Sequence, residues 1–178
     1  MMSLETILKW MVLLLSGALM CSAFWDVQSA DSAPTCLGKR VTIKGTAGPD
    51  RIKGTRGNDV IDAGEGNDLV QGKLGNDRVC GAGGDDELHG GEGKIDRLDG
   101  GDGADFLDGR RGFDADRMTG GPGNDTIWGA NYLSGGPGDD ELEVISYSGD
   151  RNRDTVDGGD DFDSCVADSP NDTVVNCE

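Results

Sequence analysis

The sequence contains a single histidine, His89, and this scarcity bears directly on catalysis. A zinc-protease motif of the H-E-x-x-H kind needs two histidines, so that motif is excluded. A Ser-His-Asp triad would have to use His89 itself. Neither a P-loop nor a G-x-G-x-x-G fingerprint occurs among the many glycines. We therefore expect that the protein is not an enzyme.

Basic residues are also scarce, with 16 lysines and arginines against 34 aspartates and glutamates and a formal net charge of −18. Phosphate binding needs a basic footprint, so the composition argues against nucleic acid as a partner. An anionic membrane surface is disfavoured for the same reason. Cations are the natural partners of such a chain.

Proline occurs only five times, whereas glycine occurs 31 times among 178 residues. The glycines follow no strict period of three, which excludes a collagen triple helix. The composition indicates a chain that turns very often, and the length suits one domain with an export segment. An acidic disordered chain would share this composition, so the periodicity of the sequence has to decide between the two.

The apolar run near the amino terminus is short. It covers the eleven residues 10–20 (WMVLLLSGALM), whereas a helix needs about 20 residues to span a bilayer. With Lys9 before it and small residues after it, the run matches the apolar region of a secretory signal. We predict that residues 1–30 form a signal peptide and a short linker, that cleavage follows Ala23 or Ser29, and that the protein is secreted without membrane insertion.

The cysteines support export. Cys21 leaves with the signal, and its lipidation is disfavoured because Met20 stands where a small residue is expected. An even number of cysteines in an exported chain predicts up to two disulfides, although a cysteine can also serve as a small apolar core residue. The four that remain are Cys36, Cys80, Cys165 and Cys177.

An internal repeat of nine residues begins at Gly45, as in GTAGPDRIK (45–53) and GTRGNDVID (54–62). Allowing for insertions, the sixth position of each unit is an aspartate: Asp50, Asp59, Asp68, Asp77, Asp86, Asp96, Asp105, Asp116, Asp125, Asp140, Asp154, Asp163 and Asp172. Two residues after each aspartate the side chain is apolar: Ile52, Ile61, Val70, Val79, Leu88, Leu98, Leu107, Met118, Ile127, Leu142, Val156, Cys165 and Val174. Thirteen aspartates in step with thirteen apolar residues are not a chance outcome of composition.

These units resemble the repeats-in-toxin (RTX) family, whose consensus is G-G-x-G-x-D-x-U-x with a large apolar residue at U. The resemblance covers residues 45–175. It implies an all-β fold, a right-handed parallel β-roll in which two nonapeptides make one coil, and calcium as the bound ion.

The spacing itself supports a metal-binding solenoid. Glycines at positions 1, 2 and 4 permit tight turns, and the three residues after each aspartate can form only a short strand. Turns two repeats apart then stack, so we expect Asp50 to face Asp68 and Asp59 to face Asp77. Carboxylates about 5 Å apart repel by roughly 3 kcal/mol at an effective dielectric of 20. A hard cation with many oxygen ligands relieves this repulsion, and calcium suits such cages better than magnesium or zinc. We expect folding that is triggered by calcium, with the thirteen aspartates as ligands.

The regularity of the repeat changes along the chain. We divide the sequence into an N-terminal cap (31–44), a calcium-binding β-roll (45–143) and a region of degenerate repeats with a C-terminal cap (144–178). Insertions near Ile95 and in 109–119, and the lack of an aspartate in the truncated unit 129–134, should distort or delete sites. The best sites should therefore lie between Asp50 and Asp105.

Both ends of the repeat array have the features of caps. Residues 36–44 (CLGKRVTIK) fit the repeat frame as a preceding unit, with Ile43 at the apolar position. A Cys165–Cys177 disulfide would close the C-terminal end. A Cys36–Cys80 disulfide is harder to form, because an ideal coil separates these residues by about two layers, and it requires the N-terminal segment to fold back.

The sequence therefore predicts a secreted calcium-binding protein that folds on ion binding and serves as a surface or matrix binding module, with its protein or polysaccharide partner unknown. Two alternatives remain: an ice- or carbohydrate-binding solenoid, and an accessory module of an extracellular hydrolase. Well-known members of the family carry a protease, lipase or pore-forming domain and a C-terminal export signal, and this sequence shows neither.

Overall fold

The computed structural model describes residues 33–178 except 94, 111–115, 130 and 146–152. The predicted signal peptide and its cleavage sites lie outside the described residues. Every strand in the described residues is short: β1 (Thr35–Cys36), β2 (Lys39–Arg40), β3 (Ile43–Lys44), β4 (Arg51–Lys53), β5 (Val60–Glu65), β6 (Leu69–Leu74), β7 (Arg78–Gly83), β8 (Glu87–Glu92), β9 (Arg97–Asp102), β10 (Phe106–Asp108), β11 (Arg117–Thr119), β12 (Thr126–Gly129), β13 (Tyr132–Pro137), β14 (Glu141–Val144), β15 (Thr155–Asp160), β16 (Ser164–Val166) and β17 (Thr173–Val175).

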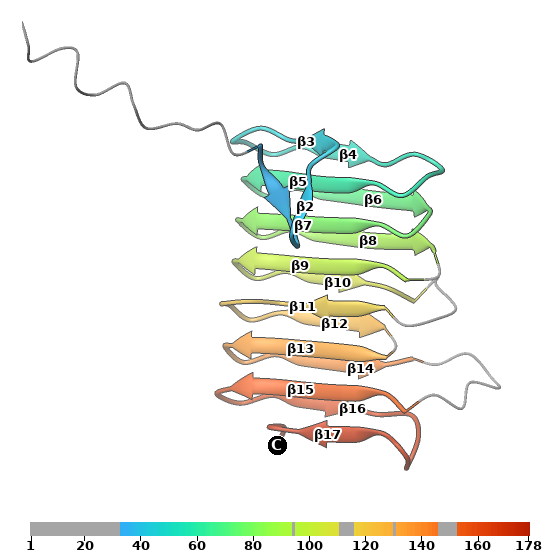
Figure 1. The fold of residues 1–178 in the computed structure, drawn as a ribbon. Coiled ribbons are helices and arrows are strands. Elements are labelled where there is room, and N and C mark those ends of the chain that lie inside the picture. Colours follow the sequence, from blue (N-terminus) through green and yellow to red (C-terminus); the bar gives the residue numbers. More distant parts are fainter. Residues whose placement is uncertain (1–32, 94, 111–115, 130, 146–152) are drawn as a thin grey trace, which may run out of the picture. The chain divides into compact units, whose positions relative to one another are not determined.

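The strands build two parallel sheets that face each other (Figure 1). The even-numbered strands from β4 to β16 form a seven-stranded sheet, and the odd-numbered strands from β3 to β17 form an eight-stranded sheet. Each strand pairs with the strand two places along the chain, as in the register Ile52↔Val70 and Ile61↔Val79. One coil of the solenoid thus uses two repeats, and the predicted all-β parallel roll is confirmed.

The core lies between the two sheets and consists mainly of one inward apolar side chain from each strand of the roll, with Ala63 of β5 and Val144 of β14 as second contributions. Residues such as Val79, Leu88 and Ile127 are fully buried, while their neighbours in sequence point outward. This alternation follows from the geometry of a strand, in which successive side chains point to opposite faces. The apolar residue two places after each aspartate is therefore the residue that fills the core.

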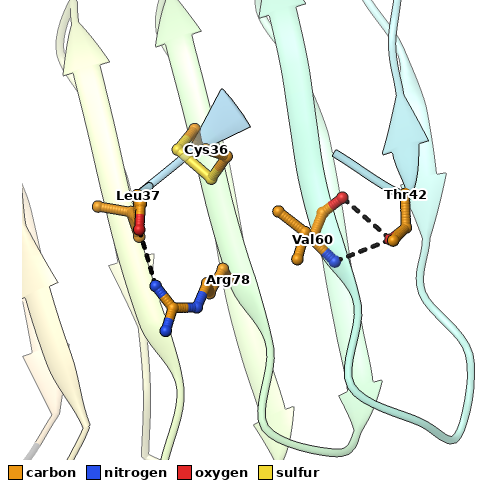
Figure 2. The surroundings of a disulfide bond; sticks show 6 residues. Cys36, Leu37, Thr42, Val60 and Arg78 are labelled. Carbon is orange, nitrogen blue, oxygen red and sulfur yellow. Dashed lines mark hydrogen bonds between the residues drawn. A yellow bond between two sulfur atoms is a disulfide. The ribbon is translucent and has the colours of Figure 1, made fainter. Parts of the chain in front are cut away.

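The N-terminal cap departs from the repeat frame. Ile43 pairs with Ile61 and packs against the core as expected, but β1 and β2 form an antiparallel hairpin instead of a turn of the roll. This hairpin lies against the eight-stranded sheet, where Cys36 is bonded to Cys80 of β7 (Figure 2). The fold-back that this disulfide requires is present, and the second disulfide joins Cys165 to Cys177.

Two further contacts hold this end of the chain, and both are visible in Figure 2. The Arg78 guanidinium donates to the Leu37 carbonyl at 2.7 Å. The Thr42 hydroxyl donates to the Val60 carbonyl at 3.1 Å and accepts from the Val60 N–H at 2.9 Å. The hairpin is thus fixed to the side of the roll by a covalent bond and by hydrogen bonds.

Candidate metal centre

The thirteen predicted aspartates form two columns, one along each edge of the roll. The strands of the two sheets run in opposite directions, so the turns that precede them lie at opposite edges (Figure 1). The first column precedes the even-numbered strands and contains Asp50, Asp68, Asp86, Asp105, Asp125, Asp140 and Asp163. The second column precedes the odd-numbered strands and contains Asp59, Asp77, Asp96, Asp116, Asp154 and Asp172.

Hydrogen bonds hold each column in register. The backbone N–H of Asp68 donates to Oδ1 of Asp86 at 2.8 Å, and the N–H of Asp86 donates to Oδ1 of Asp105 at 2.8 Å. The same bond recurs in the second column, as from the N–H of Asp59 to Oδ1 of Asp77 at 2.8 Å. The expected stacking of Asp50 on Asp68 and of Asp59 on Asp77 is therefore present.

The second oxygen of most of these carboxylates is buried without a hydrogen-bond partner. These atoms are the Oδ2 atoms of Asp68, Asp77, Asp86, Asp96, Asp105, Asp125, Asp140 and Asp163. The side chains themselves are 1–3% exposed. A buried carboxylate oxygen with no partner costs free energy that a protein normally avoids, so each of these atoms marks a place for a ligand.

Glycine makes room around these oxygens. A Cβ built on Gly72 would lie 2.6 Å from Oδ2 of Asp77, and a Cβ on Gly81 would collide with Oδ2 of Asp86 and with the Gly100 carbonyl. The first position of the repeat must therefore lack a side chain, because the carboxylate and the carbonyl of the next coil occupy that space. Together they form a small cradle lined by oxygen atoms.

Burial and stacking raise the pKa values of the column carboxyls. Desolvation, together with the charges of Asp68 and Asp105, raises the pKa of Asp86 to about 7. Desolvation, with the charges of Asp96 and Asp59, raises the pKa of Asp77 to about 6. The cause is the same in both cases: negative charge is packed where water is excluded and no cation is supplied by the protein.

The donor set fits a hard divalent cation. The cradles offer carboxylate and carbonyl oxygens, and calcium takes six to eight such oxygens in irregular geometry. Zinc would need nitrogen or sulfur ligands. The four cysteines of the described residues are bonded in pairs. The unpartnered oxygens also occur beyond the range Asp50–Asp105, at Asp125, Asp140 and Asp163.

The first two turns differ from the others. The backbone N–H and the hydroxyl of Thr46 donate to Oδ2 of Asp50 at 2.7 and 2.9 Å, and those of Thr55 donate to Oδ2 of Asp59 at 2.6 and 3.0 Å. Later units hold a residue with positive φ at this position, such as Gly101 at 103°. In the first two turns the protein therefore satisfies the carboxylate with its own donors.

Two residues of the columns escaped the sequence analysis. Asn131 of the truncated unit takes the place of the missing aspartate, since its N–H donates to Oδ1 of Asp154 at 3.0 Å. Leu133, two residues later, fills the core, and this spacing could have identified Asn131. Asp168 lies with Asp154 and Asp172, with carboxylate oxygens within 4.8 Å of one another. No periodic signal marks Asp168, because it lies in the degenerate last unit.

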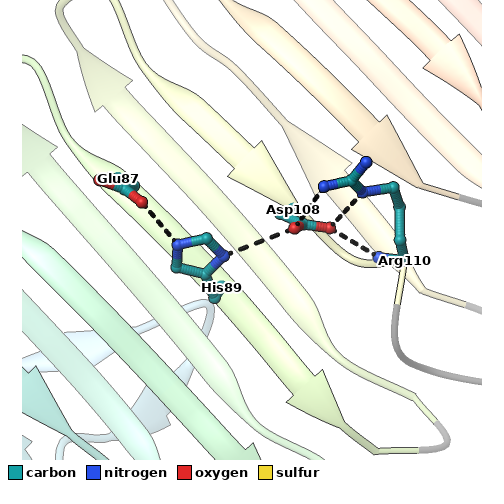
Figure 3. A network of polar contacts seen from close by, with 4 residues as sticks. All are labelled: Glu87, His89, Asp108 and Arg110. Atoms are coloured by element: carbon teal, nitrogen blue, oxygen red, sulfur yellow. Dashed lines mark hydrogen bonds and ion pairs between the residues drawn. The ribbon is translucent and has the colours of Figure 1, made fainter.

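His89 lies outside the columns, on the outer face of β8. Its side chain is half-buried. Its Nε2 contacts Oε1 of Glu87 at 2.8 Å, and its Nδ1 lies 3.6 Å from Oδ2 of Asp108 (Figure 3). Asp108 also accepts from Arg110 at 2.9 Å. The hydrogen bond to Asp108 raises the pKa of His89. Burial would raise the pKa of Asp108, but His89 and Arg110 together lower it well below its usual range.

Both ring nitrogens of His89 are thus directed at carboxylates. A general base in a Ser-His-Asp triad needs one nitrogen on the carboxylate and the other on the nucleophile. The network also contacts aromatic side chains, since the Arg110 guanidinium lies 4.4 Å from the centre of the Trp128 ring. The arrangement therefore differs from that of a Ser-His-Asp triad.

The comparisons with known proteins agree with this geometry. The family model described as the RTX calcium-binding nonapeptide repeat matches in four copies, at residues 44–79, 66–94, 81–115 and 112–142. Neither the search of curated proteins nor that of solved structures finds a match. Among the described residues, no helix has the length and apolar character needed to cross a bilayer.

Proposed function

The chain belongs to the family of RTX calcium-binding nonapeptide repeats, and from this we propose that it is a secreted protein that folds on binding several calcium ions between its stacked turns. The ligands in this proposal are the thirteen aspartates of the two columns, with backbone carbonyls of the same turns. Asp50, Asp59 and Asp172 are the weakest of them, because donors of their own turns already bond to their Oδ2 atoms.

The observation that carries the proposal is the set of eight buried Oδ2 atoms without a hydrogen-bond partner. Each aspartate holds the register of the roll through Oδ1 and presents Oδ2 to the glycine cradle of its own turn. Bound calcium would supply the positive charge that these stacked carboxylates lack. At neutral pH the columns repel without a cation, so binding and folding are coupled.

Secretion is consistent with the proposed calcium binding. Four cysteines form two disulfides, which persist in oxidising compartments and are rare in the cytosol. Extracellular calcium is also the environment for which weak sites, with dissociation constants of about 0.1–1 mM, are suited. We propose that the folded roll serves outside the cell as a surface or matrix binding module.

The alternative of an ice-binding solenoid requires a flat array of regularly spaced hydroxyls. Thr46 and Thr55 are the threonines at matching turn positions, and their hydroxyls are bound to Asp50 and Asp59. These groups support turns and are not a free array. For the alternative of a hydrolase accessory module, no specific observation in the described residues adds support.

Calcium titration tests the proposal directly. The protein is freed of metal with a chelator and titrated with calcium while far-ultraviolet circular dichroism reports β-structure and native mass spectrometry counts bound ions. We expect β-structure to appear together with several bound ions, and magnesium at the same concentration to be a poor substitute. Equal β-content in chelator and in millimolar calcium, with no ions retained, would contradict the proposal.

A further inference from the structure

Among the residues that the structure describes, both ends of the roll are open edges. In the eight-stranded sheet the edge strands are β3 and β17, and in the seven-stranded sheet they are β4 and β16. An open edge presents unpaired backbone N–H and C=O groups and is a template for another strand. The β1–β2 hairpin lies on the side of the roll, bonded to Cys80 of β7, and leaves β3 at the edge (Figure 1).

Apolar side chains are less buried at the two ends than inside. Val174 stands at the core position of the last repeat but is 43% exposed, and Cys165, at the core position of β16, is only partly buried. Val156, which pairs with Val174 and lies one coil further inside the roll, is fully buried. At the opposite end Ile43 and Ile52 are only partly buried. The core is therefore covered in the middle and uncovered at its two ends.

The two ends carry opposite charge. Residues 43–56, which include the two edge strands β3 and β4, contain four basic residues and one acidic residue: Lys44, Arg51, Lys53, Arg56 and Asp50. Residues 154–178 contain eight acidic residues and no basic one: Asp154, Asp157, Asp160, Asp161, Asp163, Asp168, Asp172 and Glu178. Four of these eight, Asp157, Asp160, Asp161 and Glu178, lie outside the columns and the cluster of Asp154, Asp168 and Asp172, so the C-terminal end stays acidic when cations fill the columns.

We propose that the basic end of one copy stacks on the acidic end of a second copy, with β3 of one adding to β17 of the other. Both strands belong to one parallel sheet and point the same way, so a shift along the roll brings them together as a parallel pair. A chain with a net charge of −18 repels its copies at most surfaces, whereas this pairing joins charges of opposite sign.

The contact is head to tail and therefore does not close on itself. Each added copy leaves a free basic end and a free acidic end, so the assembly grows as a line of copies. The inference rests on the open edges and the charges of the ends, and it goes beyond ion binding by the individual chain. The partner is a second copy of the same protein.

Charge reversal at each end tests the stacking, with sedimentation velocity in calcium as the measurement. One variant carries Arg51→Glu and Lys53→Glu on β4, whose neighbours across the sheet are the uncharged Leu69 and Gln71. The other carries Asp160→Lys and Glu178→Lys, which are exposed and lie outside the columns. The control carries Lys73→Glu and Arg97→Glu, an equal change of charge in the middle of the roll.

We expect the unmodified protein to sediment faster as its concentration rises, and this effect to weaken at about 0.5 M salt because salt screens surface charge. Each end variant should lose at least tenfold in association constant, and the control should match the unmodified protein.

Three results would overturn the proposal. They are a folded protein that stays monomeric at all concentrations, an assembly that stops at a dimer, and end variants that associate as strongly as the control. Circular dichroism on the same samples distinguishes failure of the stacking proposal from failure of the calcium-binding proposal. A protein that folds with calcium and stays monomeric refutes stacking but does not refute calcium binding.

Discussion

Replacement of Asp86 by asparagine should change the stability of the roll in opposite directions with and without calcium. Asparagine keeps an Oδ1 acceptor for the N–H of Asp68, so the hydrogen bond of 2.8 Å that sets the register can persist. It replaces the buried Oδ2, which has no partner, with an NH₂ group that cannot bind a cation. The substitution thus removes the charge and the candidate ligand together.

The pKa of Asp86 sets the size of the effect in chelator. A pKa of about 7 against the ordinary 3.8 corresponds to about 4 kcal/mol between the charged and neutral forms, at 1.36 kcal/mol for each unit. Solvent at the turn screens part of this difference, which leaves about 2 kcal/mol. In chelator at pH 7.5, Asp86→Asn should therefore stabilise the roll by about 2 kcal/mol.

In calcium the sign should reverse. A site with a dissociation constant of about 0.1 mM contributes about 3 kcal/mol at about 10 mM calcium, and Asp86 has a stacked neighbour on each side. Loss of one or two ions should then destabilise the variant by about 3–5 kcal/mol. The matched control is Asp85→Asn, which removes the same charge from the exposed neighbouring side chain. The Asp85 charge is the smallest contribution to the raised pKa of Asp86, so the control should have a smaller effect than Asp86→Asn in either condition.

The assay is circular dichroism, with urea as denaturant in calcium and with trimethylamine N-oxide to promote folding in chelator. Native mass spectrometry counts the ions that each variant retains. Destabilisation of Asp86→Asn by the same amount in both conditions would refute the reasoning, because it would mean that the carboxylate contributes only through packing and hydrogen bonds.

Three more predictions follow from the turns. Asp59→Asn should lower the number of bound calcium ions less than Asp86→Asn, because Thr55 already donates to Oδ2 of Asp59; equal losses by native mass spectrometry would contradict this. In chelator, β-structure measured by circular dichroism should increase as the pH falls from about 7.5 towards about 4. The raised carboxyl pKa values, of about 6 and 7, stabilise the folded state at acid pH, and this stabilisation is lost as the pH rises through those values. A decrease in β-structure as the pH falls over this range would contradict the prediction. Gly123→Val should destabilise the calcium-loaded roll by about 3 kcal/mol or more in urea unfolding, because φ of Gly123 is 142° and a Cβ would collide with the Gly103 carbonyl. In the same assay the control Gly57→Ala should be neutral or slightly stabilising, because the atom nearest to the added carbon is 3.8 Å away.

The repeat unit predicted both the roll and its aspartate columns because their geometry is local. The spacing from Asp86 to Leu88 places one side chain in the turn and the other in the core, whatever the rest of the chain does. Because the spacing is the same in every unit, strands two repeats apart pair in register and equivalent residues of successive coils stack on one another. The stacking of the aspartates and the buried apolar residues could therefore be read from the period alone.

The details of individual turns were less accessible. Thr46 and Thr55 differ from the glycine consensus, but only the structure shows that their hydroxyls donate hydrogen bonds to the Oδ2 atoms of Asp50 and Asp59. Asn131 enters the second column although its unit is truncated, because the strand pairing of Tyr132 with Arg117 sets its place. The first detail depends on a side-chain contact within one turn and the second on a contact between coils, and the spacing of the repeat reveals neither.

The sequence by itself determined the period of the coil, the alternation of core and solvent positions, and the placement of one aspartate in almost every turn. These features depend on residues within nine positions of one another. Only the tertiary structure decided that Cys36 reaches Cys80, that the hairpin leaves β3 exposed, and that basic and acidic residues gather at opposite open ends. Those features depend on how segments far apart in the chain meet, and a local repeat carries no information about such contacts.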